Sequence, residues 1–221
     1  EDREGGKEVK WEGVGGRDEC FGQGGVGARD VGVSLARVDR GWDEERYRRY
    51  LKKYKLPEKK VIKEYSRGMK MKLSLAAAFA ARPRLLILDE ATSGLDPVVR
   101  DEILDEFLAF IQDEEHAILL SSHITSDLEK VADYVTYLHR GRVAVSGAKD
   151  ELLDTYGKLV CGRSELERVD PALLVGLRPG QFGCEALVKN RRAFARFHPA
   201  LAVEPVSLED IMVFTVKGDA R

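Results

Sequence analysis

Two short apolar runs, each ended abruptly by polar residues, constrain the fold of this chain more than any other feature. Leu85 to Leu88 stops at Asp89 and Glu90, and Ala117 to Leu120 stops at Ser121. Apolar runs of this length are typical of strands that are buried on both faces of a parallel sheet. We therefore expect an α/β fold whose functional groups lie at the carboxyl ends of these two strands.

The segment between the two runs predicts a helix. Its apolar side chains follow the helical period from Ile103 through Phe107 to Ile111. Asp96 is a natural N-cap for this helix, and Pro97 suits its first turn. Strand, helix and strand together predict a crossover unit, which is right-handed in nearly all known sheets.

Two more helices are expected upstream of the first strand. Tyr47, Tyr50, Leu51 and Tyr54 recur at helical spacing with charged residues between them, and Pro57 should stop that helix. We favour core packing for this aromatic stripe, with a contribution to a docking surface as the alternative. The second helix runs from Met69 to Ala81, with Ser66 as its N-cap.

The rest of the chain predicts a smaller structure. A short helix over 126–132 and a hairpin that turns at Arg140 to Arg142 should follow the second strand, with another short helix over 150–156. Residues 158–221 mix short apolar runs with four prolines, and they predict a small α+β appendage. Ser207 to Ile211 is expected to start a helix that docks this appendage.

Composition excludes several classes of protein. Lys and Arg total 36 against 38 Asp and Glu, for a net charge of -2, so we expect no nucleic-acid partner. The longest apolar run is far shorter than the about 20 residues of a membrane span. Cys20, Cys161 and Cys184 are sparse and far apart in sequence, which predicts free thiols and neither a disulfide framework nor a zinc site.

Glycine divides the chain near residue 41. Eleven of the 21 glycines fall within residues 1–41, which disfavours regular structure there, apart from a short helix over 29–40. We expect three regions: an atypical Gly-rich segment over 1–41, a main domain over 42–157 and an accessory region over 158–221. The chain has neither an initiator Met nor a secretory leader, so we expect a fragment or a processed form.

Three blocks of sequence, taken in order and spacing, resemble the ATP-binding subunits of ABC transporters. They are Tyr65 to Met69, Leu85 to Pro97, and Ser121 to His123. The resemblance runs from about Trp42 to Gly147, roughly half of the chain. It implies a partial P-loop NTPase fold with parallel core strands and a helical subdomain, and an ATPase that uses ATP and Mg²⁺.

The resemblance assigns roles to the residues after the two strands. Asp89 would be the carboxylate associated with Mg²⁺, and Glu90 would be the catalytic glutamate that polarises the attacking water. His123 resembles the switch histidine that contacts the γ-phosphate. Asp96 would align two subunits, in addition to its role as a helix N-cap. An Asp-Glu pair after an apolar strand is by itself common, so only its place in this series supports these roles.

Ser66 and Gly68 match the fixed points of the ABC signature. A Ser hydroxyl and free backbone N–H groups at a helix start make an anion site, which agrees with the γ-phosphate contact that the family implies. That γ-phosphate belongs to ATP held by the opposite subunit, so a head-to-tail dimer is expected. The variant Tyr-Ser-Arg-Gly-Met resembles bacterial exporters, whereas Arg67 can also be read as a solvated charge.

The phosphate loop GxxxxGK[ST] is missing. Gly5-Gly6-Lys7-Glu8 is rejected because it lacks the first glycine and because Glu8 would repel phosphate. The position of the Q-loop stays open between Gln23 and the segment Asp18 to Phe21, and a plain loop is as good an interpretation. We therefore expect negligible ATPase activity from the 221-residue chain alone.

Partners follow from the same resemblance. A second ATP-binding subunit and a separate membrane permease are expected, with the permease docked against residues from about Asp18 to Lys63. That would place the chain in the cytoplasm, peripheral on the inner face of the membrane. The clusters at Lys52 to Lys55 and Lys59 to Lys60 are interpreted as a solvated face, with attraction to anionic lipid as the alternative. Two other functions stay open: a soluble, non-transport ABC-type ATPase, and a non-catalytic structural remnant.

Overall fold

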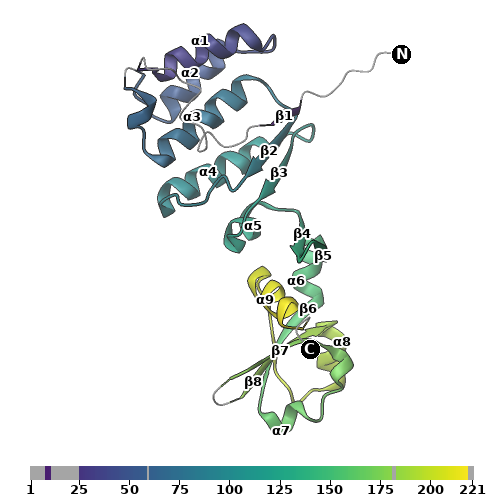
Figure 1. Cartoon of the computed structure of the whole chain (residues 1–221). Coiled ribbons are helices and arrows are strands. Elements are labelled where there is room, and N and C mark those ends of the chain that lie inside the picture. The colour runs from purple at the N-terminus through teal and green to yellow at the C-terminus, as the bar shows by residue number, and fades with distance from the viewer. Residues whose placement is uncertain (1–7, 11–24, 59, 181–182, 219–221) are drawn as a thin grey trace, which may run out of the picture. The chain divides into compact units, whose positions relative to one another are not determined.

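The chain consists of two compact units that meet between Ile124 and Thr125, and each is described by itself. A computed structural model describes residues 8–10, 25–58, 60–180 and 183–218. The N-terminal unit covers Glu1–Ile124 and the C-terminal unit covers Thr125–Arg221 (Figure 1). The contacts thus divide the chain well before residue 158, and the predicted functional boundaries at 41/42 and 157/158 stay predictions.

The described part of the N-terminal unit contains a parallel sheet. β1 (Glu8–Lys10), β2 (Leu85–Asp89) and β3 (Ala117–Ser121) are arranged in the order β1-β2-β3. Leu86 and Leu88 are buried, as expected for a central strand. The prediction that both apolar runs form parallel strands is confirmed.

The predicted burial of 117–120 on both faces is wrong. Leu119 is 62% exposed, and Ile118 and Leu120 are only half-buried. Within the described residues, β3 pairs with β2 on one side and ends the sheet on the other. An apolar run therefore identified a strand correctly here, while its position at the edge decided how much of it is buried.

Helices α1 (Ala28–Val38), α2 (Glu44–Lys53), α3 (Arg67–Ala80) and α4 (Pro97–Phe110) complete the unit, with a 3₁₀ turn over Ile62–Glu64. The aromatic stripe of α2 forms core: Tyr47 is buried, and Tyr50 and Tyr54 pack against the same cluster. Its helix stops at Lys53, before the predicted stop at Pro57. Ser66 and Asp96 cap α3 and α4 as predicted.

The C-terminal unit is α+β, as predicted. Thr125–Val131 forms α5, and the hairpin of β4 (Tyr134–His139) and β5 (Arg142–Ala148) turns at Arg140-Gly141. A second, antiparallel sheet has the order β7-β8-β6-β9 among the described residues. The strands of this sheet and the helices around it are, in chain order, α6 (Lys149–Thr155), β6 (Tyr156–Cys161), α7 (Arg163–Leu166), a 3₁₀ turn (Pro171–Leu173), β7 (Leu174–Pro179), β8 (Cys184–Lys189), α8 (Arg191–Phe197), β9 (Val203–Glu204) and α9 (Leu208–Gly218).

Two cysteines that are distant in sequence are neighbours in this sheet. Cys161 on β6 is the direct cross-strand partner of Cys184 on β8, and both are buried free thiols. Antiparallel pairing brings the ends of the two strands together, a register that spacing along the chain does not reveal. Cys20 lies outside the described residues.

Neither a membrane-spanning helix nor a metal-binding cluster is present in the part of the chain that the structure describes. None of its helices is both long and apolar enough to cross a membrane. Its His, Cys, Asp and Glu side chains form no group of three or more that could hold a metal ion by protein ligands alone.

Candidate functional site

The carboxyl ends of β2 and β3 bring four polar residues together, which we name the strand-end cluster: Asp89, Glu90, Ser121 and His123. Asp89 and Ser121 are register partners, and the Ser121 hydroxyl donates a hydrogen bond to Oδ1 of Asp89. Nδ1 of His123 lies 2.5 Å from Oε2 of Glu90. The structure thus assembles three residues that the sequence motifs singled out, and it adds Ser121.

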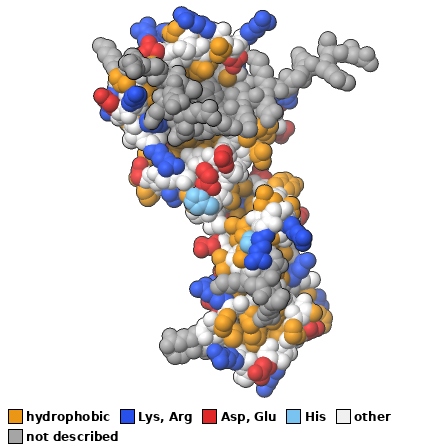
Figure 2. Space-filling view, viewed as in Figure 1, with side chains coloured by type: hydrophobic (Ala, Val, Ile, Leu, Met, Phe, Trp, Pro, Cys, Tyr) orange, Lys and Arg blue, Asp and Glu red, His pale blue; other side chains and the backbone are white. Residues whose placement is uncertain are grey.

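The strand-end cluster is open to solvent. The side chains of His123 and Glu90 are 68% and 40% exposed. On the viewed face of the N-terminal unit, acidic side chains lie next to a histidine side chain (Figure 2). An ion pair this exposed contributes little to folding stability. A ligand from solvent can therefore contact both side chains.

Glu90 has an unusual backbone. Its φ is +49°, in the left-handed region that costs a residue with a side chain roughly 1 kcal/mol. Its N–H donates to the carbonyl of Ser121 over 3.1 Å, and its carbonyl accepts from the N–H of Ser93 over 3.1 Å. The chain therefore turns sharply at the residue whose carboxylate meets His123, and strain of this kind is concentrated at functional sites.

A second group of residues surrounds the starts of α3 and α4, which we name the helix-start cluster: Ser66, Arg67, Gly68, Gly94 and Asp96. The exposed Ser66 caps α3 by accepting a hydrogen bond from the N–H of Met69 over 3.2 Å. Asp96 caps α4 by accepting from the N–H of Val99 over 3.0 Å. Both helix starts therefore present a positive dipole end near a polar side chain.

Two glycines allow these helix starts to touch. A Cβ on Gly68 would lie 2.9 Å from Cγ1 of Val99 in the first turn of α4. A Cβ on Gly94, whose φ is +66°, would lie 2.6 Å from Nη1 of Arg67. Arg67 is exposed, but its guanidinium lies against the turn before α4. The exposure of Arg67 agrees with the interpretation as a solvated charge, and its guanidinium also lies beside a loop that is far away in sequence.

The two clusters are separate as far as polar contacts go. No hydrogen bond or ion pair joins Ser66 or Gly68 to Glu90 or His123 among the described residues. Thr92, in the turn between the clusters, is fully buried, and its hydroxyl has no partner in the described chain. The site residues predicted from sequence are thus all placed, but in two clusters.

The strand-end cluster fits a magnesium ion that is shared with a phosphate ligand. Mg²⁺ keeps several waters and binds through one or two carboxylates together with substrate phosphates, not through a cage of protein ligands. The exposed Asp89 carboxylate beside the Ser121 hydroxyl provides such a partial donor set. Neither carboxylate of the cluster is consumed by an ion pair with Lys or Arg in the described chain.

Comparison with protein families finds one match: residues 12–93 match the family model of the ABC transporter. The match begins upstream of residue 42, where the motif resemblance was expected to start, and it ends in the turn after β2. It therefore includes Ser66, Gly68, Asp89 and Glu90, whereas Asp96 and His123 lie beyond it.

Curated relatives have the same description. The chain is 35% identical over 109 residues to the ABC transporter ATP-binding protein YtrB of Bacillus subtilis, covering 49% of this chain and 37% of YtrB. It is 38% identical over 93 residues to the lantibiotic transport ATP-binding protein SrtF of Streptococcus pyogenes, covering 42% and 40%. The bacitracin transport ATP-binding protein BcrA of Enterococcus faecalis is 40% identical over 86 residues, covering 39% and 28%. The chain thus spans less than half the length of these relatives.

Among solved structures, an inward-facing conformation of a putative metal-chelate type ABC transporter resembles this chain with a TM-score of 0.53. The likeness covers 79% of this chain and 71% of that chain at 15% identity, so it concerns the fold alone. Together with the parallel order of β1, β2 and β3, it confirms the predicted class: a partial P-loop NTPase fold with a small α+β region at the C-terminal end.

Proposed function

Because this chain carries part of an ABC-type ATP-binding domain, we propose that it acts as the ATP-hydrolysing subunit of an ABC transporter. The observation that carries the proposal is the contact between Glu90 and His123 at the ends of β2 and β3. The names of SrtF and BcrA, which describe lantibiotic and bacitracin transport, support a transport role. With the signature variant at Tyr65 to Met69, they support export as its direction.

In this proposal the strand-end cluster performs the chemistry. Glu90 orients the attacking water and accepts its proton, a role that suits an exposed carboxylate held by a strained turn. His123 is held by Glu90 and donates a hydrogen bond to the γ-phosphate. Asp89, oriented by the Ser121 hydroxyl, would hold Mg²⁺ through water. Mg²⁺ supplies positive charge to the phosphate oxygens.

The helix-start cluster would serve ATP held by a second subunit. The exposed Ser66 and the N–H groups around Gly68 are suited to a γ-phosphate that arrives from outside the chain. The lack of a polar contact between the two clusters within the described chain is what a shared site requires. Asp96, next to this surface, would align the two subunits in a head-to-tail dimer.

The proposed partner in the membrane is a separate permease, docked against residues between about Asp18 and Lys63. Such docking would hold the chain at the inner face of the cell membrane, in the cytoplasm. Residues 25–58 and 60–63 of this range form helical structure with exposed basic side chains, whereas residues 18–24 lie outside the described chain.

The test is ATP hydrolysis measured on two forms of the protein. The 221-residue chain alone should show negligible turnover, because it lacks a phosphate loop. Fusing residues 25–221 behind a family segment that contains GxxxxGK[ST] should restore turnover, and Glu90→Gln should lower it about 100-fold or more. Robust Glu90-dependent turnover by the unfused chain would refute the role given to the missing loop. A Glu90→Gln fusion as active as its parent would refute the catalytic role.

A further inference from the structure

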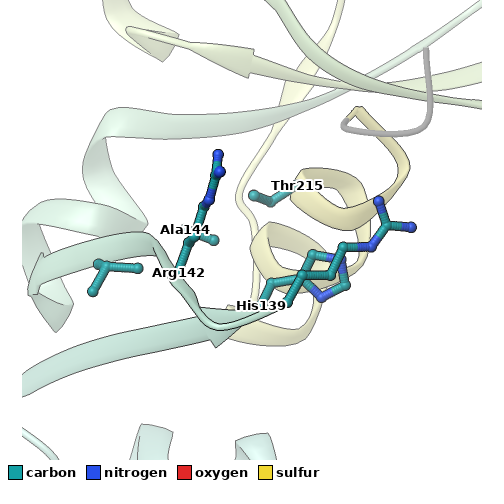
Figure 3. A pocket seen from close by; sticks show the side chains of 6 residues that line it. His139, Arg142, Ala144 and Thr215 are labelled. Carbon is teal, nitrogen blue, oxygen red and sulfur yellow. The ribbon is translucent and has the colours of Figure 1, made fainter.

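The tip of the β4-β5 hairpin and α9 line a polar cavity in the C-terminal unit, and this cavity is partly open to solvent. Its volume is about 610 Å³, within the range of small-molecule sites. Figure 3 shows His139, Arg142 and Ala144 on the hairpin, with Thr215 on α9. The lining residues are His139, Arg140, Arg142, Val143, Ala144 and Thr215. None of them belongs to the strand-end or the helix-start cluster.

Local structure places the polar groups of this cavity on one side of the hairpin. His139 and Arg142 are direct cross-strand partners on either side of the two-residue turn, so their side chains share a face. Arg140 and Gly141 in the turn both have left-handed φ, +48° and +74°, as a tight hairpin turn requires. Thr215 donates its hydroxyl proton to the carbonyl of Ile211 over 2.7 Å, which fixes its side chain.

The cavity is positively charged and contains no acidic lining residue in the described chain. Arg140 and Arg142 form no ion pair with any described residue, whereas other arginines of the same unit do, such as Arg192 with Asp154. Each guanidinium can therefore give its full set of donors to a ligand.

One buried nitrogen also lacks a partner. Nε2 of His139 is shielded from solvent and forms no hydrogen bond within the described chain. The ring stacks on Tyr137 with centroids 6.3 Å apart, which holds it in place. A buried polar atom without a partner costs free energy, and no described residue offsets that cost at His139.

We propose that this cavity binds the phosphate group of a small organic phosphate or of a phospholipid headgroup. The planar, forked arrangement of N–H donors on an arginine guanidinium matches the geometry of phosphate oxygens. The half-buried Ala144, two residues after Arg142, adds an apolar contact for the carbon part of the ligand. This proposal does not rest on the proposed ATPase function, because none of its residues belongs to the strand-end or the helix-start cluster.

Binding of pyrophosphate to the full chain, measured by titration calorimetry at constant ionic strength, tests the proposal. Arg142→Gln should weaken binding about tenfold or more, and Arg140→Gln with Arg142→Gln should abolish it. His139→Gln should weaken it severalfold. Arg168→Gln, which removes an exposed arginine of the same unit outside the cavity, should leave it within twofold.

Co-sedimentation with vesicles distinguishes the two sources of phosphate. The vesicles contain phosphatidylglycerol in phosphatidylcholine. If the chain sediments with them and binds pyrophosphate only weakly, the ligand is a phospholipid headgroup. If the chain binds pyrophosphate and does not sediment with the vesicles, the ligand is a soluble phosphate. Either result supports the site only if Arg142→Gln weakens the binding about tenfold or more. Binding that survives the double substitution, or no binding of either probe, overturns the proposal. Hydrogen exchange in β4 and β5 confirms that each variant keeps its hairpin.

Discussion

The parallel sheet β1-β2-β3 and the four-stranded antiparallel sheet β7-β8-β6-β9 differ in how deeply their strands are buried. In the N-terminal unit, the parallel sheet ends in exposed polar residues, and Leu119 of β3 is itself 62% exposed. In the C-terminal unit, Ala186, Leu187 and Val188 of β8 are fully buried, and they contribute to clusters on both faces of an antiparallel sheet. Continuous apolar strands are therefore not reserved for parallel sheets. The number of covered faces, and not the direction of pairing, decides whether an apolar run is core.

The largest expected effect is on the free energy of unfolding, and it tests the contrast between the buried strand β8 and the exposed strand β3. Leu187→Ala should destabilise the C-terminal unit by about 3 kcal/mol, because it leaves a cavity between packed layers. Leu119→Ala removes the same atoms from an exposed edge and should cost less than about 0.5 kcal/mol. Urea unfolding followed by hydrogen exchange in peptides of each unit measures both. Equal losses would show that the exposed face of β3 is covered in solution.

The next effect concerns the contact between the starts of α3 and α4. Gly94→Ala should cost about 1 to 2 kcal/mol, from left-handed backbone strain and from displacement of Arg67. Gly141→Ala is the matched control, because Gly141 has a similar φ and no atom within 4 Å of an added Cβ. It should cost about 1 kcal/mol from strain alone.

A double-substitution cycle isolates the part due to Arg67. In an Arg67→Ala background, the cost of Gly94→Ala should fall to that of Gly141→Ala. Thermal unfolding of the four variants supplies the cycle. An unchanged cost of Gly94→Ala would mean that the guanidinium does not rest on this turn.

At Glu90 we expect a substitution to raise the stability of the protein, in contrast to the losses predicted above. Glu90→Gly should raise stability by about 1 kcal/mol, because glycine adopts a φ of +49° without penalty. Glu90→Gln keeps the strained backbone and should leave stability nearly unchanged, since the contact with His123 is exposed. Calorimetric melting of both variants measures the difference. A loss of stability in Glu90→Gly would show that this site stores no strain.

Local sequence signals predicted much of the fold and of the candidate site. Ser66 and Asp96 were identified as caps because capping depends on residues within one helical turn. The polar ends of β2 and β3 were identified because parallel strands end at one edge of a sheet. Caps and strand ends are both short-range features, and so they can be found without knowledge of the fold.

Contacts that depend on register or on packing between distant segments were missed. The Ser121–Asp89 hydrogen bond, the Arg67–Gly94 contact and the Cys161–Cys184 pair join residues that are 23 to 32 positions apart. Spacing along the chain carries no information on such pairs until the strands and helices are placed. The exposure of β3 was missed for the same reason, since an apolar run does not reveal how many of its faces are covered.

The smallest expected effect is a difference in alkaline stability between the two units. Burial, and then the neighbouring Cys184, raises the pKa of the Cys161 thiol above its ordinary value of 9.0. Burial likewise raises the pKa of Tyr47 and Tyr54 in the N-terminal unit above 10.0. In each case the folded state favours the protonated group, so the contribution to stability is complete below the unfolded pKa and is lost as pH rises through the folded pKa.

The C-terminal unit should therefore begin to lose stability near pH 9, and the N-terminal unit about one pH unit higher. Trp42 packs against the core of the N-terminal unit, so its fluorescence in a Trp11→Phe background follows the urea midpoint of this unit under reducing conditions. Hydrogen exchange in β6 and β8 follows the other unit. Cys161→Ala should remove the loss of stability that hydrogen exchange in β6 and β8 reports between pH 9 and 10. It should leave the urea midpoint measured by fluorescence unchanged. If the fluorescence midpoint falls first, the tyrosines and not the thiol control the alkaline limit of this chain.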